Sequence, residues 1–396
     1  MNELGTTHRR DTTWWGPAVA VTTAAWGAQQ FAPLLLMYRA ELAVSTTIVH
    51  GVFATYVVGL IPGLLFGGPV ADRYGRRPVV LTALVASTMA SVLLLAGGSG
   101  VGYLFAGRLV AGFASGAAFS AGAAWVRELS ADDGERGPRR ATVAMTAGFG
   151  LGPLAAGVLA QWAPARTVLP YLPHVVLALA ALLVVWRVPE TRPPDTPAGP
   201  VRHLRLPELR SRRFRTVIAP LAPWVFGPVT VAVAYLPALI EPRLGGYALL
   251  FSTLVTLLCA GAGTAVVPVA RTVAAAGAGR LLGTGLAIVV VGLVVAAGAA
   301  VTGAPLIVVA AAVVLGAGYG CCQVYGLTEV QRLARPDHLA GVTAAYQALS
   351  YLGFAASVPL AAVDDAVPPS LLLLGLAALA TLTLVVTSRS ERSTRR

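Results

Sequence analysis

The sequence contains no lysine, so all 29 of its basic side chains are arginine. It therefore has no phosphate-binding loop of the Gly-x-x-x-x-Gly-Lys type, and transport driven directly by ATP is not supported. Cysteine is also scarce: Cys259, Cys321 and Cys322 lie in apolar stretches and form no metal-ligating or disulfide framework. No cluster of histidine, cysteine and acidic residues suggests a metal site, so we expect neither an enzyme nor a cofactor.

Charge is rare and apolar residues are abundant. Only 12% of the residues are charged, whereas 56% are hydrophobic. The first apolar stretch follows a polar start and is too long for a signal peptide. Apolar windows of roughly 20 residues, the length that spans a bilayer, recur along the whole chain. They lie near 14–37, 46–68, 78–97, 101–126, 140–161, 167–187, 215–240, 246–270, 281–301, 304–327, 339–362 and 368–387. The sequence predicts an all-α membrane protein with twelve transmembrane helices.

The arginines fall almost entirely on one side of this predicted topology. With both termini in the cytoplasm, 25 arginines lie on that side, and only Arg39, Arg166 and Arg243 face outward. Cytoplasmic loops of membrane proteins are enriched in this way. The net charge of +12 therefore reports topology and contact with anionic lipid, and it gives no reason to expect nucleic acid. We expect a multi-pass protein of the cell (plasma or inner) membrane with both termini cytoplasmic.

One long linker divides the chain. Residues 188–214 are rich in proline and arginine and too poor in apolar residues to form a core. The predicted domains are a six-helix bundle at 1–187, this cytoplasmic linker, and a second six-helix bundle at 215–396. A weak repeat at an offset of 201 residues aligns Glu128 with Glu329. Two pseudo-symmetric bundles around a central pathway are typical of transporters with parallel repeats.

The loop between the second and third apolar stretches carries the most informative motif. A positive cytoplasmic loop that only orients the protein would explain its arginines, but not its aspartate or its spaced glycines. The pattern Gly-x-x-x-Asp-Arg-x-Gly-Arg-Arg resembles the loop signature between helices two and three of the major facilitator superfamily. Its residues are Gly68, Asp72, Arg73, Gly75, Arg76 and Arg77.

Two further stretches support the resemblance. Residues 107–116 are similar to the fourth-helix signature of this superfamily, in which an arginine, here Arg108, is followed by spaced glycines. An ionisable residue inside a span is a functional candidate, the alternative being a side chain that extends to the interface. Residues 148–157 look like the fifth-helix signature of its antiporter branches, the alternative being small-residue packing with a proline kink. The antiporter-like positions are Gly148, Gly152, Pro153 and Gly157, and Ala156 replaces one usual glycine.

The resemblance implies a gate, meaning a set of contacts that closes the pathway on one side. Asp72, Arg76 and Glu128 would form it on the cytoplasmic side, with Asp72 facing the start of helix eleven near Asp337, where the helix dipole is positive. The equivalent loop in the second half, residues 268–280, lacks the aspartate. We therefore expect a one-sided gate.

Residues for substrate binding and coupling are less clearly indicated. The first span contains Gln29 and Gln30 but no acid, and we expect these glutamines to line a central cavity opposite Arg108. Candidate proton carriers are the carboxyl group of Glu241, next to Pro242, and the histidines His50 and His174. Histidine is included because it titrates near neutral pH.

The predicted function is secondary active transport of a small, lipophilic organic molecule by alternating access, as proton-coupled efflux. The proton gradient would drive it, and the functional unit would be a monomer in the bilayer. Two alternatives stay open: an importer or facilitator of a small organic solute, and a non-transporting membrane sensor on the same fold. Direction of transport separates the first two, whereas signalling without flux marks the third.

Overall fold

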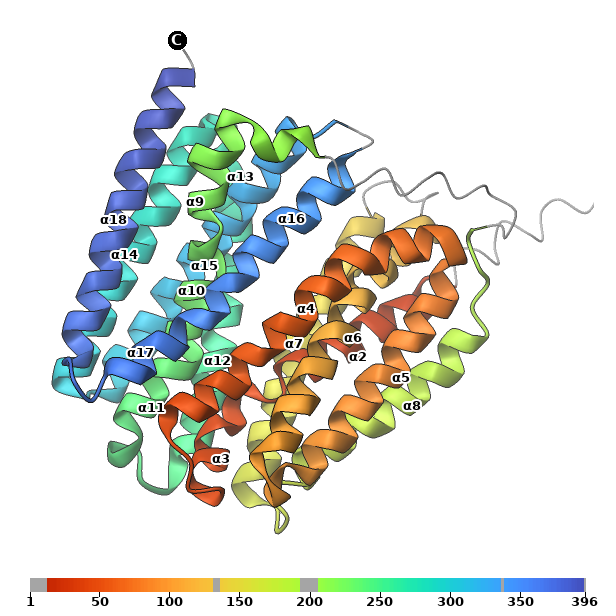
Figure 1. Cartoon of the computed structure of the whole chain (residues 1–396), viewed down its shortest axis with the longest axis horizontal. Helices are drawn as coiled ribbons and strands as arrows, with labels where there is room; N and C mark the ends of the chain where they lie inside the picture. The colour runs from red at the N-terminus through yellow and green to blue at the C-terminus, as the bar shows by residue number, and fades with distance from the viewer. Residues whose placement is uncertain (1–12, 131–135, 193–205, 336–337, 395–396) are drawn as a thin grey trace, which may run out of the picture. The chain divides into compact units, whose positions relative to one another are not determined.

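The computed structural model describes residues 13–130, 136–192, 206–335 and 338–394, and all regular structure in these ranges is helical (Figure 1). Among the described residues, eleven helices are long and apolar enough to cross a membrane. They correspond to the last eleven predicted spans. The one remaining predicted span, 14–37, is the first along the chain; it is also helical, but its helix is interrupted.

The first predicted span is divided into three pieces. They are α2 (Trp15–Gln29), the 3₁₀ turn η1 (Ala32–Leu34) and α3 (Leu35–Glu41). Pro33 lies inside the 3₁₀ turn. Proline has no backbone N–H and its ring clashes with the preceding turn, so a continuous α-helix cannot pass through it undisturbed. None of the pieces reaches the length of a spanning helix by itself.

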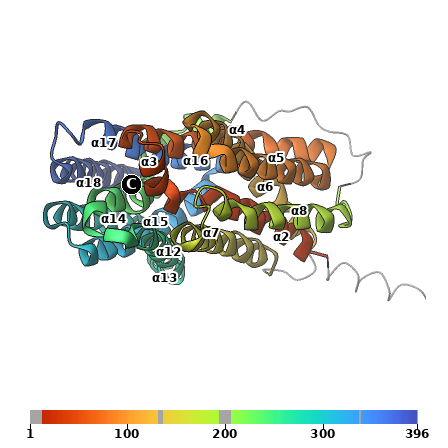
Figure 2. The ribbon, with the colours of Figure 1, turned by 90° about the horizontal axis from the view of Figure 1, so that it is seen from below.

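The chain forms two compact units, and the first comprises Met1–Leu34 and Thr55–Arg202. In this unit α2 packs against α5, α6, α7 and α8 (Figure 2). Its core includes Trp125, Leu84 and Val185, all fully buried. Its helices are α2, most of α4 (Thr46–Tyr74), α5 (Arg76–Leu95), α6 (Val101–Glu128), α7 (Arg136–Trp162) and α8 (Leu172–Trp186), with 3₁₀ turns η2 (Ala96–Ser99) and η4 (Leu169–Tyr171).

Glycines allow α4 and α6 to approach closely. A Cβ atom added at Gly59 or Gly63 would meet the backbone of α6, and one added at Gly112 or Gly116 would meet the backbone of α4. Small residues at such crossings replace the hydrophobic driving force that lipid does not supply. The glycine-rich composition of this unit is therefore used in packing.

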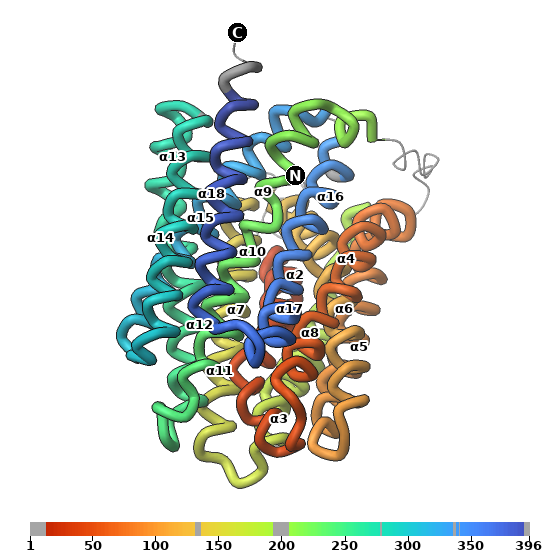
Figure 3. Tube along the Cα trace, turned by 60° about the vertical axis from the view of Figure 1, so that its left-hand side comes forward, coloured from red at the N-terminus to blue at the C-terminus, as the bar shows by residue number. Residues whose placement is uncertain are grey.

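The second unit comprises Leu35–Ala54 and His203–Arg396. Its helix α14 packs against both α15 and α18, which run beside it (Figure 3). The α-helices of this unit are α3, the start of α4, α9 (Ala219–Leu221), α10 (Pro223–Thr230), α11 (Leu236–Ile240), α12 (Ala248–Ala265), α13 (Val267–Ala276), α14 (Ala278–Thr302), α15 (Pro305–Leu333), α16 (Leu339–Tyr351), α17 (Ser357–Val363) and α18 (Pro369–Thr394). Its short turns are η6 (Pro207–Arg210), η7 (Phe214–Ile218), η8 (Val231–Tyr235), η9 (Glu241–Arg243), η10 (Gly245–Tyr247) and η12 (Leu352–Ala356).

Two spans of the second unit that cross each other contain irregular turns. The 214–240 span contains two π-helical turns, η7 and η8, and the 339–363 span contains the 3₁₀ turn η12. A Cβ atom at Gly353 would run into the backbone of Gly227 and Pro223, so the crossing requires glycine. Irregular turns inside long helices often mark functional positions.

Helix α4 belongs to both units. Its residues up to Ala54 group with the second unit, together with α3, and the rest group with the first. We call residues 35–54 the α3–α4 hairpin. The division into a bundle at 1–187, a linker and a bundle at 215–396 stays a prediction. Residues 193–205 of the linker lie outside the described residues.

Candidate functional site

The turn between α4 and α5 is built around Gly75. Its φ of 100° is in a region that favours glycine, and a Cβ atom there would collide with the carboxylate of Glu190. This turn lets α5 begin immediately after α4 ends. It thereby sets the residues of the predicted loop motif at two adjoining helix ends.

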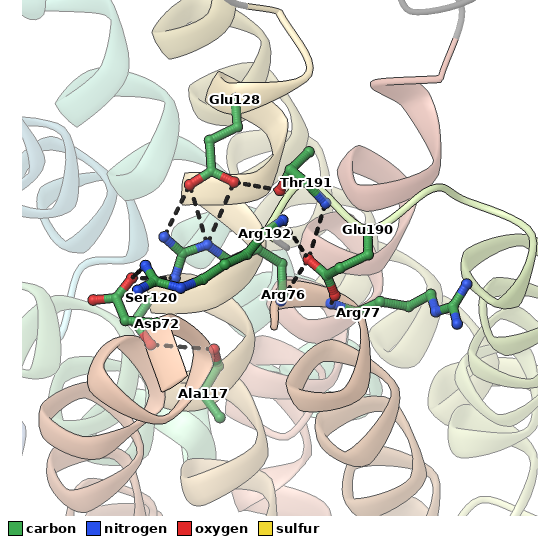
Figure 4. Close-up of polar contacts among 9 residues, drawn as sticks. All are labelled: Asp72, Arg76, Arg77, Ala117, Ser120, Glu128, Glu190, Thr191 and Arg192. Atoms are coloured by element: carbon green, nitrogen blue, oxygen red, sulfur yellow. Dashed lines mark hydrogen bonds and ion pairs between the residues drawn. The ribbon is translucent and has the colours of Figure 1, made fainter. Parts of the chain in front are cut away.

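Arg76 lies at the centre of a charged network in the first unit (Figure 4). Its side chain is 10% exposed, and its Nη1 lies 2.6 Å from Oδ1 of Asp72, which is in the last turn of α4. Its Nε and Nη2 donate to Glu128 Oε1 at 3.1 and 2.9 Å. The structure thus brings together the three residues for which the sequence predicts a gate, with one guanidinium holding two carboxylates.

Glu190 completes this network, and the sequence analysis missed it. Its two carboxylate oxygens accept hydrogen bonds from the backbone N–H groups of Arg76 and Arg77, both at 2.9 Å. A carboxylate is stabilising at a helix N-terminus because unpaired N–H groups point outward there. Glu190 therefore fixes the start of α5. The repeat offset of 201 residues also relates Glu190 to Glu391 and was the signal available for finding it.

The residues after Glu190 extend the contacts. Thr191 Oγ1 donates to Glu128 Oε2 at 2.5 Å, and Arg192 Nη1 lies 3.7 Å from Asp72 Oδ1 (Figure 4). The first residues of the linker therefore join the charged network of the first unit. Asp72, with a side chain 50% exposed, faces two arginines.

Three remaining motif residues lie at the edge of this network. Arg73 is exposed and packs over the ring of Tyr74 at 5.3 Å. Arg77 takes part through its backbone N–H. A Cβ atom at Gly68 would come no closer than 4.0 Å to another residue, so this conformation does not itself require glycine there. Asp337 lies outside the described residues, so its proximity to Asp72 stays a prediction.

The second unit contains a charged cluster of its own. Glu329 is 1% exposed, and its Oε2 lies 2.6 Å from Arg213 Nη2, while its Oε1 accepts from Arg332 at 3.1 Å. Arg213 also donates to Glu391 Oε1 at 2.9 Å, and Tyr325 donates to the same oxygen at 2.7 Å. One arginine therefore pairs with two carboxylates, as in the first unit, but here both carboxylates are buried.

Arg213 comes from the end of the linker, and this is why comparing the loops alone did not reveal it. Burial by itself lowers the pKa of Arg213, but the hydrogen bond from its guanidinium to Glu329 and the charges of both glutamates raise it overall. The arginine is therefore held in its charged form beside the carboxylates.

Glu208 contacts the residue that precedes α16. It is buried, and its Oε1 lies 2.8 Å from His338 Nδ1. Burial raises the pKa of the Glu208 carboxyl, but the hydrogen bond to His338 and the backbone donors lower it overall. Leu206 packs against Gly341 in the first turn of the same helix. The end of the linker is therefore fastened to the start of α16 within the second unit.

Arg108 is buried inside α6, with 1% of its surface exposed. Its Nη1 donates to the backbone oxygen of Ala28 at 3.0 Å, and its guanidinium lies 4.5 Å from the ring of Tyr56 and 5.0 Å from that of Phe31. The side chain therefore stays inside the first unit between aromatic rings. Cation–π contacts of this kind compensate part of the cost of removing a charge from water.

Gln30 and His174 belong to a separate buried polar cluster. His174 Nε2 lies 3.1 Å from the carbonyl oxygen of Thr23, which can only accept, so we assign the ring hydrogen to Nε2. Its Nδ1 lies 2.7 Å from Ser91 Oγ and accepts from it. Gln30 Nε2 donates to Ser91 Oγ at 3.0 Å. His174 is thus hydrogen bonded through both nitrogens and links α2, α5 and α8, while Gln29 is partly exposed.

Glu241 is engaged in an ion pair. Its Oε2 lies 3.3 Å from Arg39 Nη1, and the two side chains are 30% and 41% exposed. Arg39 lies on α3 of the α3–α4 hairpin, and both residues belong to the second unit.

The antiporter-like motif lies on the face of α7 that meets α2. Cβ atoms at Gly148 and Gly152 would collide with the backbone of α2 near Thr22 and Trp26, and Thr22 Oγ1 donates to Ala144 O at 2.9 Å. Pro153 and Gly157 are buried in the same helix. The motif therefore lies where α7 packs closely against α2.

In the described part of the chain, no group of three or more histidine, cysteine or acidic side chains is arranged to hold a metal ion. The arrangement therefore offers ion pairs, a buried cation and hydrogen-bonded helix contacts.

Comparison with known proteins decides the family. A model of the Major Facilitator Superfamily matches residues 17–358. The chain belongs to the major facilitator superfamily. The resemblance to this superfamily and the all-helical membrane fold, both predicted from the sequence, are thereby confirmed.

Two curated relatives of this superfamily member are named for resistance to antibiotics or drugs. It is 29% identical over 169 residues, 42% of this chain and 41% of the relative, to a bicyclomycin resistance protein homolog of Haemophilus influenzae. It is 32% identical over 92 residues, 23% of each chain, to the multidrug resistance protein MdtL of Klebsiella pneumoniae. The matches thus span less than half the length of these relatives.

Solved structures support the fold over nearly the whole chain. The crystal structure of a point mutant of the nucleoside transporter NupG has a TM-score of 0.75 at 11% sequence identity, covering 96% of this chain and 98% of that one. A second NupG structure gives a TM-score of 0.70 at 10% identity. At this identity the likeness establishes the fold alone.

Proposed function

We propose that this protein is a proton-coupled exporter of small, lipophilic organic molecules that works by alternating access in the cell membrane as a monomer. Membership of a transporter superfamily and two relatives named for drug resistance support export. The observation that carries the proposal is Arg108, a charge held inside a span by one carbonyl and two aromatic rings. A buried charge in a membrane helix is costly and is retained for function.

The surroundings of Arg108 favour a lipophilic substrate with a polar group. The rings of Phe31 and Tyr56 offer flat apolar surfaces, and Arg108 supplies hydrogen-bond donors between them. Ligand sites commonly combine an apolar lining with a few fixed polar groups. In this proposal Arg108 orients the substrate, Gln29 contributes a contact, and Gln30 positions the helix through Ser91.

The network of Asp72, Arg76 and Glu128 acts as the cytoplasmic gate in this proposal. Partly exposed ion pairs are individually weak, so such a network can be formed and broken during each cycle. Glu190 holds the start of α5 in place while the pairs of Arg76 change. In this proposal the Arg213 cluster has the corresponding role in the second unit, in place of the one-sided gate that the loops alone predict.

Everted membrane vesicles test the proposal. A fluorescent cationic or neutral lipophilic dye should accumulate inside them when respiration makes their lumen acidic. Collapse of the pH gradient by nigericin should abolish the accumulation. Uptake by right-side-out vesicles, with no transport in everted ones, would instead identify an importer. Equilibration that ignores the gradient would identify a facilitator.

A further inference from the structure

The α3–α4 hairpin is fastened to the rest of the second unit by contacts at three successive levels. At one end Arg39 pairs with Glu241 at 3.3 Å. Thr47 Oγ1 donates to the backbone oxygen of Ala361 at 2.9 Å. Further along α4, the rings of Phe53 and Phe354 lie 5.5 Å apart. The hairpin therefore contacts η9 and, at two levels, the 339–363 span.

His50 lies between the hydrogen-bonded and the aromatic level. It is three residues from Thr47 and three from Phe53, so the three side chains share one face of α4. It is 2% exposed, and its ring centroid lies 6.3 Å from that of Tyr235 on η8. Its Nδ1 is buried and has no hydrogen-bond partner among the described residues.

The elements that receive the hairpin repeat this feature. The hydroxyls of Thr230, Tyr235 and Ser357 are also buried without a hydrogen-bond partner in the described part of the chain. α17, which begins at Ser357, packs against η8. Buried polar groups are normally paired, and each unpaired one costs free energy. These unpaired groups lower the stability of the docked hairpin. A contact of reduced stability is one that can open.

Charged groups surround His50 on several elements. Arg39 on α3 is the cation whose charge acts on His50, and it is partly balanced by Glu241 on η9. Asp364, just after α17, acts on Tyr235. Burial and the neighbouring charge of Asp365 raise the pKa of Asp364, while Arg39 acts in the opposite direction. A second cation placed at His50 would meet a positive neighbour in a buried position.

The other candidate proton carriers are already engaged. His174 is hydrogen bonded through both ring nitrogens, and Glu241 is paired with Arg39. Of the two candidate histidines, His50 is the one with a buried ring nitrogen that has no hydrogen-bond partner among the described residues.

We propose that His50 is the proton-binding residue of a latch formed by the α3–α4 hairpin, and that its protonation releases the hairpin from the second unit. The proton comes from the aqueous phase, binds Nδ1 when the hairpin is released, and returns to water when the hairpin docks. Docking buries a neutral imidazole, whereas the released state hydrates an imidazolium, so the two equilibria are linked. The inference gives the proposed exporter a coupling residue, and it rests on that function only for its meaning in transport.

Electron–electron distance measurements on the full-length protein in nanodiscs test the latch. Nitroxide labels on Ile48→Cys and Val363→Cys report the separation of the hairpin from α17, in a background with the three buried native cysteines changed to alanine. Between pH 8 and pH 5 a second, longer distance should appear. The ratio of released to docked protein should change by at most about tenfold per pH unit, since one proton is involved.

Matched variants decide whether His50 is responsible. In His50→Gln the distance should be independent of pH, and in His50→Arg the longer distance should dominate at every pH. His174→Gln is the control and should keep the wild-type response. Circular dichroism and size-exclusion chromatography establish that each variant is folded.

The idea is overturned if the wild-type distance ignores pH, or if His50→Gln keeps the wild-type shift. It is equally overturned if Asp364→Asn or Glu241→Gln, but not His50→Gln, removes the response. These measurements need neither substrate nor transport. A failed vesicle experiment with an intact pH response would therefore refute the exporter and leave the latch.

Discussion

Replacing Arg108 by methionine should separate a functional from a structural role for this side chain. The substitution keeps much of the length of the side chain and removes the charge. Arg108 is 1% exposed, donates to Ala28 O at 3.0 Å and lies 4.5 Å from the ring of Tyr56. All of these contacts end in Arg108→Met.

The opposing free-energy terms are of similar size. A hydrogen bond from a charged donor contributes about 1.5–3 kcal/mol, and a desolvated cation–π contact about 2 kcal/mol. Placing an arginine at the centre of a membrane helix costs about 2.5–3.5 kcal/mol, and the side chain also loses rotamer freedom. The terms largely offset one another, so we expect the free energy of unfolding of Arg108→Met to change by no more than about 2 kcal/mol.

The assay compares stability with transport in the same preparation. Thermal unfolding followed by size-exclusion chromatography should shift by a few degrees, because about 1 kcal/mol corresponds to roughly 2–4 °C in larger domains. Dye transport in everted vesicles should fall at least about tenfold, corresponding to about 1.4 kcal/mol of lost stabilisation. Arg108→Lys should recover part of it as a point charge without the planar donor geometry. Wild-type transport by Arg108→Met would refute the substrate role, and complete loss of the fold would show that the arginine is structural.

Three further predictions concern the gate, the linker and the topology. Transport should slow severalfold in each of the gate variants Asp72→Asn, Arg76→Ala and Glu128→Ala. The double variants should be no worse than the single ones, because the residues act as one network. Additive defects in a double-mutant cycle would contradict this. Glu208→Gln should lower thermal stability at pH 6–8, and this difference should disappear as the pH falls below about 4. The reason is that the pKa of the Glu208 carboxyl is lowered in the folded state, so its stabilisation is lost when it is protonated. A difference in stability that persists at lower pH would contradict the contact assigned to Glu208. Ser99→Cys should react with an impermeant maleimide on intact cells, whereas Ala276→Cys should react only after lysis, and the reverse pattern would invert the predicted orientation.

Much of the fold follows from local sequence patterns. Apolar length predicts the eleven continuous spans, because a bilayer requires about 20 apolar residues in each helix. The break of the first span at Pro33 was not readable from proline alone, because α4 continues through Pro62 and Pro69. The grouping of residues 35–54 with the second unit was not readable either, because it depends on tertiary contacts such as that between Thr47 and Ala361.

The candidate site was predictable where a short motif contains it. Asp72 and Arg76 lie four residues apart in one motif, on either side of the turn at Gly75, so the local sequence already suggests that they are close. Glu190 and Arg213 lie far from their partners along the chain, and nothing local identifies them as members of the charged clusters. Likewise, the sequence offered His50, His174 and Glu241 as candidate proton carriers, and their hydrogen-bond partners in three dimensions distinguish them.

The most direct test of the central claim is proton flux in proteoliposomes that contain only this protein. With a pH-sensitive dye trapped inside, adding a lipophilic substrate to one side should move protons in the direction opposite to the substrate. The flux should be absent from liposomes containing Arg108→Met. Substrate movement without any change in the trapped dye would contradict proton-coupled export by this protein.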